Sequence, residues 1–166
     1  MPSVLFICTA NICRSPMASA LFRQKIKKIY GEDDWLITSA GTWATDGMPA
    51  SLNSTAVMEE KGIDIQDHRS QIVSNELLQQ HNLVLTMEKG HKEALQVEFP
   101  QWADRVYLLS EMIGGSFDID DPYTRKIDDY RVTADELDQL LSDGFEKICQ
   151  LANDKVINRL DGDKQD

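Results

Sequence analysis

The sequence predicts a doubly wound α/β fold built on a parallel sheet, and two observations support that prediction. Short, continuous apolar runs recur along the chain, as expected of strands that are buried on both faces of a sheet. Longer stretches whose apolar residues recur at helical spacing lie between these runs. Alternation of strand and helix favours parallel strands that are joined by right-handed helical crossovers.

Four apolar runs are the expected strands of this sheet. They occupy residues 4–8, 35–41, 82–87 and 105–109. Each is short and is followed by polar or small residues, so each strand is expected to end at the same edge of the sheet. Ligands of open parallel sheets bind at that edge, beyond the carboxyl ends of the strands.

The helical patterns differ in regularity. The first helix is expected to follow residue 15, with Ala18, Phe22, Ile26 and Ile29 on one face, and a second, less regular one surrounds Val57. The clearest pattern lies near the end of the chain and predicts one helix with a single apolar stripe, made of Leu137, Leu141, Phe145, Ile148, Ala152 and Val156. The terminal residues 160–166 are expected to be frayed.

Composition narrows the class of protein. The 166 residues, 42% hydrophobic and 27% charged, are typical of one globular domain, expected over residues 1–166. A formal charge of −11 argues against a nucleic-acid partner, and the absence of a long apolar segment or signal pattern argues against a membrane and favours the cytoplasm. Three cysteines are too few for a disulfide framework or a four-ligand zinc site, so reduced thiols and no metal are expected.

The residues after the first strand suggest an anion site. Cys8 ends the strand, and Ser15 followed by Pro16 resembles a helix N-cap with proline at the first helical position. Backbone N–H groups of the loop over residues 8–15, together with the helix dipole, can hold a tetrahedral oxyanion, and Arg14 can bind two of its oxygens. The same positive field favours the thiolate of Cys8, which would make it a nucleophile beneath a bound phosphate; otherwise Cys8 is a buried residue that ends a strand.

Covalent phosphoryl transfer also needs a proton donor for the leaving group. Asp121 follows the fourth expected strand, and Pro122 restricts its backbone to an extended or turn conformation. Asp120 is the rival carboxylate, and Asp118, Asp120 and Asp121 together could form a solvated acidic loop or a calcium site, although the glycine and distant glutamate of an EF-hand loop are missing. The proline favours Asp121.

Four motifs, in order along the chain, carry a resemblance to a known family. They are Cys-x5-Arg-Ser at residues 8–15, SAGT at 39–42, DHRSQ at 67–71 and DPY at 121–123. Cys-x5-Arg alone is a weak signal, but the four together make the chain, from about residue 3 to about residue 156, resemble the low-molecular-weight protein tyrosine phosphatases.

The resemblance implies a flavodoxin-like sheet of four parallel strands with helices on both faces, no metal or cofactor, a monomer, and tyrosine-phosphorylated proteins as substrates. It implies that Cys8 is the nucleophile, Arg14 the phosphate clamp and Asp121 the general acid and base, with a cysteinyl-phosphate intermediate. It further implies a phosphate-binding and supporting set of Thr9, Ala10, Asn11, Ile12, Cys13, Ser15, Ser39 and His68, and a substrate groove lined by Ile12, Trp43 and Tyr123. Without the resemblance, Asn11 and Ser39 would be ordinary turn residues and His68 a structural histidine.

Several positions bear on specificity and regulation. Relatives that dephosphorylate arginine carry threonine where this chain has Ile12, and an apolar residue fits a phosphotyrosine ring better. Cys13 is either a packing residue or a partner that pairs with Cys8 on oxidation. The family usually has an aromatic residue of the substrate groove a few residues after SAGT, where this chain has Thr45. Trp43 lies close to that position in the sequence and could replace it. Glu88 replaces a frequent aspartate and could steer Arg14.

Rival functions remain at this point. A protein arginine phosphatase of the same fold is one, and an arsenate reductase is another, although it needs further cysteines in mid-chain and none lies between Cys13 and Cys149. A catalytically inactive phosphopeptide-binding module is a third, and the presence of both Cys8 and Asp121 argues against it.

Overall fold

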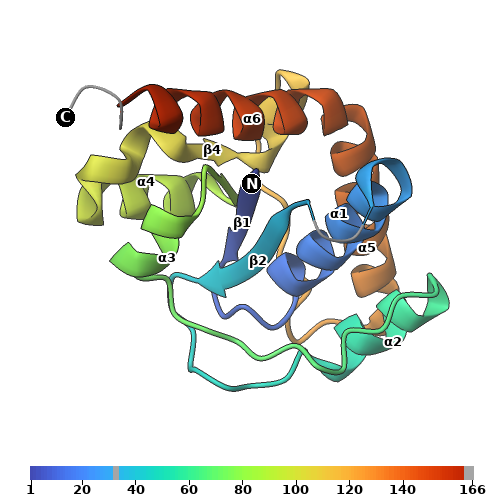
Figure 1. Cartoon of the computed structure of the whole chain (residues 1–166). Helices are drawn as coiled ribbons and strands as arrows, with labels where there is room; N and C mark the ends of the chain where they lie inside the picture. The colour runs from blue at the N-terminus through green and yellow to red at the C-terminus, as the bar shows by residue number, and fades with distance from the viewer. Residues whose placement is uncertain (32–33, 163–166) are drawn as a thin grey trace.

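The computed structural model describes residues 1–31 and 34–162, and its centre is a parallel sheet of four strands (Figure 1). Its strands are β1 (Ser3–Cys8), β2 (Leu36–Gly41), β3 (Leu83–Thr86) and β4 (Val106–Leu108), in the order β2-β1-β3-β4. All neighbouring pairs are parallel. Each strand falls on one of the four apolar runs, with β1 beginning one residue earlier at Ser3, and the predicted flavodoxin-like sheet is confirmed.

Strand β1 is central and is buried along its whole length. In the register of the sheet Cys8 lies opposite Gly41 of β2, and Ile7 lies opposite Thr86 of β3. The loops that follow these three strands therefore emerge at one edge, as expected for parallel strands.

Helices cover both faces of the sheet (Figure 1). They are α1 (Arg14–Tyr30), α2 (Leu52–Glu60), α3 (Asn75–Gln80), α4 (Lys89–Glu98), α5 (Ile127–Asp143) and α6 (Phe145–Gly162), with two short 3-10 helices, η1 (Pro100–Arg105) and η2 (Leu109–Ile113). Val4 and Phe6 of β1 pack with α1, α2, α5 and α6, whereas Leu5 and Ile7 pack with α3 and α4. Alternate residues of one strand thus belong to two separate apolar layers.

The prediction of one continuous helix near the end of the chain is wrong, because Gly144 separates α5 from α6. The Gly144 N–H donates to Leu140 O at 2.9 Å and closes α5. A Cβ at Gly144 would lie 2.8 Å from the Cβ of Met112, so glycine lets this turn approach η2 closely. The apolar stripe nevertheless runs through both helices, since Leu141 and Ile148 are buried in the same cluster.

Two smaller expectations also differ from the structure. Ile29, predicted on the buried face of the first helix, is 62% exposed in the last turn of α1. Helix α6 includes residues 160–162, which were expected to be frayed, and residues 163–166 lie outside the described residues.

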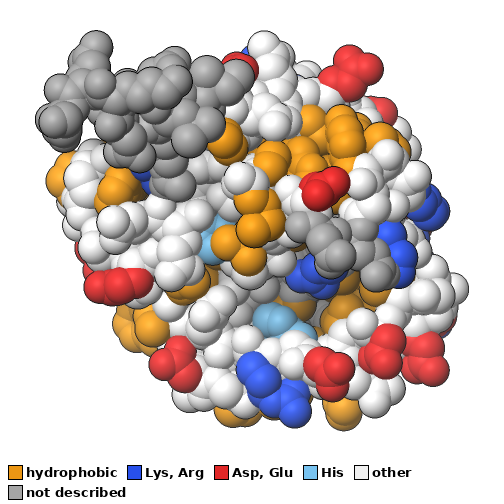
Figure 2. Space-filling model, in the orientation of Figure 1, with side chains coloured by type: hydrophobic (Ala, Val, Ile, Leu, Met, Phe, Trp, Pro, Cys, Tyr) orange, Lys and Arg blue, Asp and Glu red, His pale blue; other side chains and the backbone are white. Residues whose placement is uncertain are grey.

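Two features of the described residues bear on possible partners: the charges on the visible surface and the length and apolar character of the helices. Figure 2 shows acidic and basic side chains interspersed on the visible face, without a broad basic surface, in keeping with the formal charge of −11. In the described part of the chain, no helix is both long and apolar enough to cross a bilayer.

Candidate active site

The loop between β1 and α1, residues 9–13, forms the floor of the site. Cys8, the last residue of β1, is 3% exposed. Within the described chain, the backbone N–H groups of residues 9–15 donate to no protein acceptor. Helix α1 begins at Arg14 and adds the positive end of its dipole. Consecutive unpartnered amides at a helix N-terminus suit a tetrahedral oxyanion.

Asn11 holds this loop in shape from beneath. Its φ of 59° is a left-handed conformation, which costs less for asparagine than for most residues. Its Nδ2 donates to Ser15 Oγ at 2.8 Å and to Ser39 Oγ at 2.9 Å, and its Oδ1 accepts from the Gln71 N–H at 3.0 Å. The carbonyl oxygen of Asn11 accepts from His68 Nε2 at 2.7 Å. The structure therefore brings together the residues that were expected to support the loop.

Ser15 does not cap the helix as the sequence predicted. Cys13 occupies the N-cap position, and the Ser15 hydroxyl contacts the site instead. Ser15 Oγ lies 3.0 Å from Cys8 Sγ and accepts from Asn11. Because Asn11 supplies that proton, the hydroxyl hydrogen of Ser15 is free to donate to the sulfur. A donor on the sulfur favours its anionic form.

Arg14 is 1% exposed and is among the largest fully buried side chains of the described residues. Its Nη1 donates to Ile119 O at 2.7 Å, while Nη2 lies 2.8 Å from Glu88 Oε2 and 3.4 Å from Asp121 Oδ2. In the described part of the chain, Nε and Nη2 make no well-aligned hydrogen bond although both are buried. These two nitrogens form one edge of the guanidinium, the edge that can bind two oxygens of a phosphoryl group side by side.

Asp121 lines the same pocket as Cys8 and Arg14. The pocket has a volume of about 160 Å³, and its lining includes Cys8, Ile12, Arg14, Asp121 and Tyr123. Asp121 Oδ1 accepts from the Tyr123 N–H at 3.1 Å, which fixes the direction of the carboxyl group.

The neighbouring aspartates lie elsewhere. Asp118 Oδ1 accepts from the Lys89 N–H at 2.7 Å, and Asp120 is exposed and does not line the pocket. Among the described residues, no group of three His, Cys, Asp or Glu side chains could hold a metal ion. This placement favours Asp121 over Asp120 as the proton donor.

The remaining predicted residues lie around the pocket in different ways. Thr9, Ala10 and Cys13 line it. Trp43 is held close by its N–H, which donates to Thr9 O at 2.9 Å, but its side chain is 84% exposed and does not border the pocket. Its part in a substrate groove stays a prediction.

Cys13 makes contacts that point to a protonated thiol. Its Sγ lies 3.5 Å from Ser51 Oγ and 3.6 Å from the Tyr130 hydroxyl, and burial raises the pKa of the thiol. Cys8 and Cys13 are both free cysteines in this structure.

Gly41 and Gln71 support the site, although reasoning from the sequence gave neither of them a role. A Cβ at Gly41 would lie 2.3 Å from Thr9 O, so only glycine allows β2 to approach the β1–α1 loop. Gln71 Nε2 donates to Ser39 O at 3.0 Å. Both residues belong to the quoted motifs, SAGT and DHRSQ, so the signal was present in the sequence.

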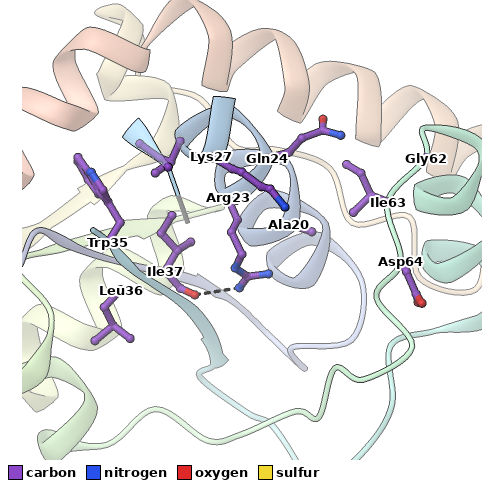
Figure 3. A pocket seen from close by; sticks show the side chains of 12 residues that line it. Ala20, Arg23, Gln24, Lys27, Trp35, Leu36, Ile37, Gly62, Ile63 and Asp64 are labelled. Carbon is purple, nitrogen blue, oxygen red and sulfur yellow. Dashed lines mark hydrogen bonds between the residues drawn. The ribbon is translucent and has the colours of Figure 1, made fainter. Parts of the chain in front are cut away.

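A larger cavity lies away from these groups. It has a volume of about 580 Å³ and lies between α1, the start of β2 and residues 62–64 (Figure 3). Arg23 reaches into it and donates to Ile37 O at 2.9 Å. Neither Cys8, Arg14 nor Asp121 borders it, so the smaller pocket is the candidate active site.

The chain is similar to known proteins over most of its length. Residues 3–155 match the family model of the low molecular weight phosphotyrosine protein phosphatases. A protein named protein-arginine-phosphatase from Geobacillus stearothermophilus is 38% identical over 146 residues, which cover 87% of this chain and 95% of the relative. A probable low molecular weight protein-tyrosine-phosphatase, EpsP, from Ralstonia solanacearum is 38% identical over 125 residues, covering 75% of this chain and 81% of the relative.

A solved structure gives the same result for the fold. The low molecular weight protein tyrosine phosphatase from T. tengcongensis superposes with a TM-score of 0.83 at 40% sequence identity, over 89% of this chain and 99% of that one. With residues 3–155 matched by the family model and its fold shared with a solved member, the chain belongs to the low molecular weight phosphotyrosine protein phosphatases.

Proposed function

We propose that this protein hydrolyses phosphotyrosine in proteins through a cysteinyl-phosphate intermediate. One observation carries the proposal: Cys8, Arg14 and Asp121 border one pocket above a loop of unpartnered amides. A nucleophile, an oxyanion clamp and a proton donor are the three groups that covalent phosphoryl transfer needs.

The first step transfers the phosphoryl group to sulfur. The Cys8 thiolate attacks phosphorus in line, the S–P bond forms and the bond from phosphorus to the tyrosine oxygen breaks. Asp121, protonated, gives its proton to the departing phenolate oxygen. Arg14 and the amides of residues 9–15 stabilise the charge on the three equatorial oxygens.

The second step regenerates the enzyme. Asp121, now a carboxylate, takes a proton from a water molecule that attacks phosphorus. The P–S bond breaks, inorganic phosphate forms and Cys8 returns to its thiolate, which the Ser15 hydroxyl stabilises.

Phosphotyrosine is preferred over phosphoarginine as a substrate because an apolar and an aromatic side chain line the pocket. Ile12 and Tyr123 both line the pocket, and a phenyl ring packs against such side chains better than a charged guanidinium does. The named arginine phosphatase among the relatives makes phosphoarginine the rival substrate.

Matched peptides test the choice of substrate. Two peptides that differ only in carrying phosphotyrosine or phosphoarginine are incubated with the enzyme, and released phosphate is measured. We expect faster release from phosphotyrosine, with Ile12→Thr narrowing the difference. Preference of the parent enzyme for phosphoarginine would overturn the assigned substrate.

A second measurement tests the covalent mechanism. With para-nitrophenyl phosphate as substrate, Cys8→Ser is expected to abolish turnover. Cys149→Ser is the matched control, because Cys149 is a buried thiol in α6 that does not border the pocket. Turnover by Cys8→Ser equal to that of the parent would refute the cysteinyl-phosphate intermediate.

The proposal extends to the setting of the enzyme. One domain of this chain acts as a monomer in the cytoplasm, without a cofactor, on tyrosine-phosphorylated proteins. The net charge of −11 and the site built within one chain support this part of the proposal. Sedimentation velocity tests the oligomeric state, and a dimer at micromolar concentration would contradict it.

A further inference from the structure

A histidine that was not among the predicted site residues contacts both the β1–α1 loop and the carboxylate that pairs with Arg14. His91 lies in the first turn of α4 and is 7% exposed. Its Nε2 is 2.8 Å from Thr9 Oγ1 and 3.3 Å from Glu88 Oε2. Glu88 Oε2 is in turn 2.8 Å from Arg14 Nη2. A chain of polar contacts therefore runs from the β1–α1 loop through His91 and Glu88 to the phosphate clamp.

The contacts determine where the imidazole carries its proton. A lone pair on Nε2 would face the Glu88 carboxylate at 3.3 Å, which is repulsive, so Nε2 bears the hydrogen. His91 Nδ1 is buried and has no hydrogen-bond partner among the described residues, so a proton on that nitrogen would be left unsatisfied. Both observations favour the neutral imidazole with hydrogen on Nε2.

This tautomer also fixes the role of the Thr9 hydroxyl. Thr9 Oγ1 accepts from His91, so its own hydrogen is available to another acceptor. Thr9 lines the pocket that Cys8 and Arg14 border, so its hydroxyl can donate to a phosphoryl oxygen bound there. Without His91, the hydroxyl could turn its lone pairs toward the anion.

Glu88 is the second group that His91 orients. The Glu88 side chain is 36% exposed, so solvent would let the carboxylate rotate if nothing held it. His91 lies one helical turn further along and contacts the same oxygen that pairs with Arg14. Restricting that oxygen keeps the guanidinium edge aimed at the substrate.

We propose that His91 is a positioning residue that aligns the Thr9 hydroxyl and, through Glu88, the Arg14 guanidinium for oxyanion binding. This inference rests on the proposed phosphatase function. Burial lowers the pKa of His91, which keeps the ring neutral at pH 7. Arg14 adds to the lowering, while the nearby carboxylates of Glu88, Asp118 and Asp121 act in the opposite direction.

The test compares two substitutions that differ in their ability to donate. His91→Leu fills the space without a donor, whereas His91→Gln can bring an amide N–H close to the position of Nε2. Two quantities are measured for each: kcat/KM with para-nitrophenyl phosphate, and the dissociation constant of inorganic phosphate. A hydrogen bond that aligns groups around an anion is worth about 10- to 100-fold, so His91→Leu should weaken both by about that factor. His91→Gln should recover most of the loss.

His81 supplies the matched control. Its Nε2 also lies 2.8 Å from a threonine hydroxyl, that of Thr38, but Thr38, unlike Thr9, does not line the pocket. His81→Leu removes a buried imidazole from an equivalent pair, and should lower the melting temperature while leaving phosphate affinity unchanged. If His91→Leu and His81→Leu affect phosphate affinity equally, the role of His91 is structural and the inference is wrong.

A double-mutant cycle identifies the route of the effect. If His91 acts through the Thr9 hydroxyl, His91→Leu should cost much less in a Thr9→Val background than in the parent. Fully additive losses would overturn that route. If the parent does not hydrolyse aryl phosphates, the proposed function fails, and the phosphate dissociation constants alone decide the inference. Equal constants for the parent and His91→Leu would refute it.

Discussion

Replacing Gly41 by alanine tests how closely the end of β2 packs against the β1–α1 loop. The added Cβ would lie 2.3 Å from Thr9 O, 2.9 Å from the Cβ of Ala44 and 3.1 Å from Asn11 N. Two of these three neighbours are backbone atoms, so no side-chain rotation relieves the contact. The Thr9 carbonyl must retreat by about 0.7 Å to reach 3.0 Å, the shortest separation that real Cβ atoms show.

That displacement affects activity more than stability. Overpacking of this kind costs about 1–3 kcal/mol of the free energy of unfolding, or about 2–12 °C in melting temperature. Misplacement of reacting groups by about 1 Å can lower the rate about 10²-fold, and residues 9 and 11 carry amides of the oxyanion site. We expect Gly41→Ala to fold and to lose about 10²-fold in kcat/KM with para-nitrophenyl phosphate.

Gly90→Ala is the control for this substitution. A Cβ there meets nothing within 4 Å, and Gly90 lies within helix α4, where alanine is favoured over glycine by about 1 kcal/mol. We expect Gly90→Ala to keep full activity and to melt at a slightly higher temperature. If Gly41→Ala stays within about threefold of the parent in kcat/KM, contrary to the misplacement estimate, the steric argument is wrong.

Three further predictions concern individual groups of the site. Asp121→Asn removes the proton donor, and should lower kcat about 10²–10⁴-fold for phosphotyrosine but less for substrates with acidic leaving groups; comparing both substrate classes by steady-state kinetics checks this. Arg14→Lys replaces the planar guanidinium, which contacts Ile119 O and Glu88, with a single ammonium group. This substitution should lower kcat/KM by about 10²–10³-fold even where circular dichroism shows a folded protein. Burial lowers the pKa of His68, so the unfolded chain binds a proton at this histidine more readily than the folded chain does. The free energy of unfolding should therefore fall as the pH decreases below about 6.5 toward the folded pKa. Urea midpoints at a series of pH values measure this, and a midpoint that rises on acidification would contradict it.

The sheet could be predicted from the sequence because its strands are buried on both faces. A run such as residues 4–8 has no polar member to expose and is too short for a buried helix, so an interior strand is the expected structure. The break between α5 and α6 could not be predicted from periodicity, because Leu141 and Ile148 face the same core on both sides of Gly144. The turn depends on contact with Met112, which is distant in sequence.

The sequence also predicted part of the candidate site. Cys8, Arg14 and Asp121 follow strand ends and belong to recognisable motifs, and the structure brings them into one pocket. Only the N-cap role predicted for Ser15 was wrong, because a serine before a proline has the local pattern of a cap whatever its tertiary contacts are. Nothing in the sequence indicated a role for His91 in the site. A single histidine in a helix is ordinary, and its partner Thr9 is 82 positions away.

Arg14 links the order of folding to the onset of activity. Its guanidinium binds Ile119 O, a carbonyl 105 positions further along the chain, and pairs with Glu88 and Asp121 on two other segments. A nascent chain that has emerged only as far as β4 would contain Cys8 and its loop, yet would hold Arg14 on one side only. A chain that ends at β4 therefore lacks Ile119 and Asp121, two of the three groups that hold Arg14, and the site is complete only when residues 119–121 are in place.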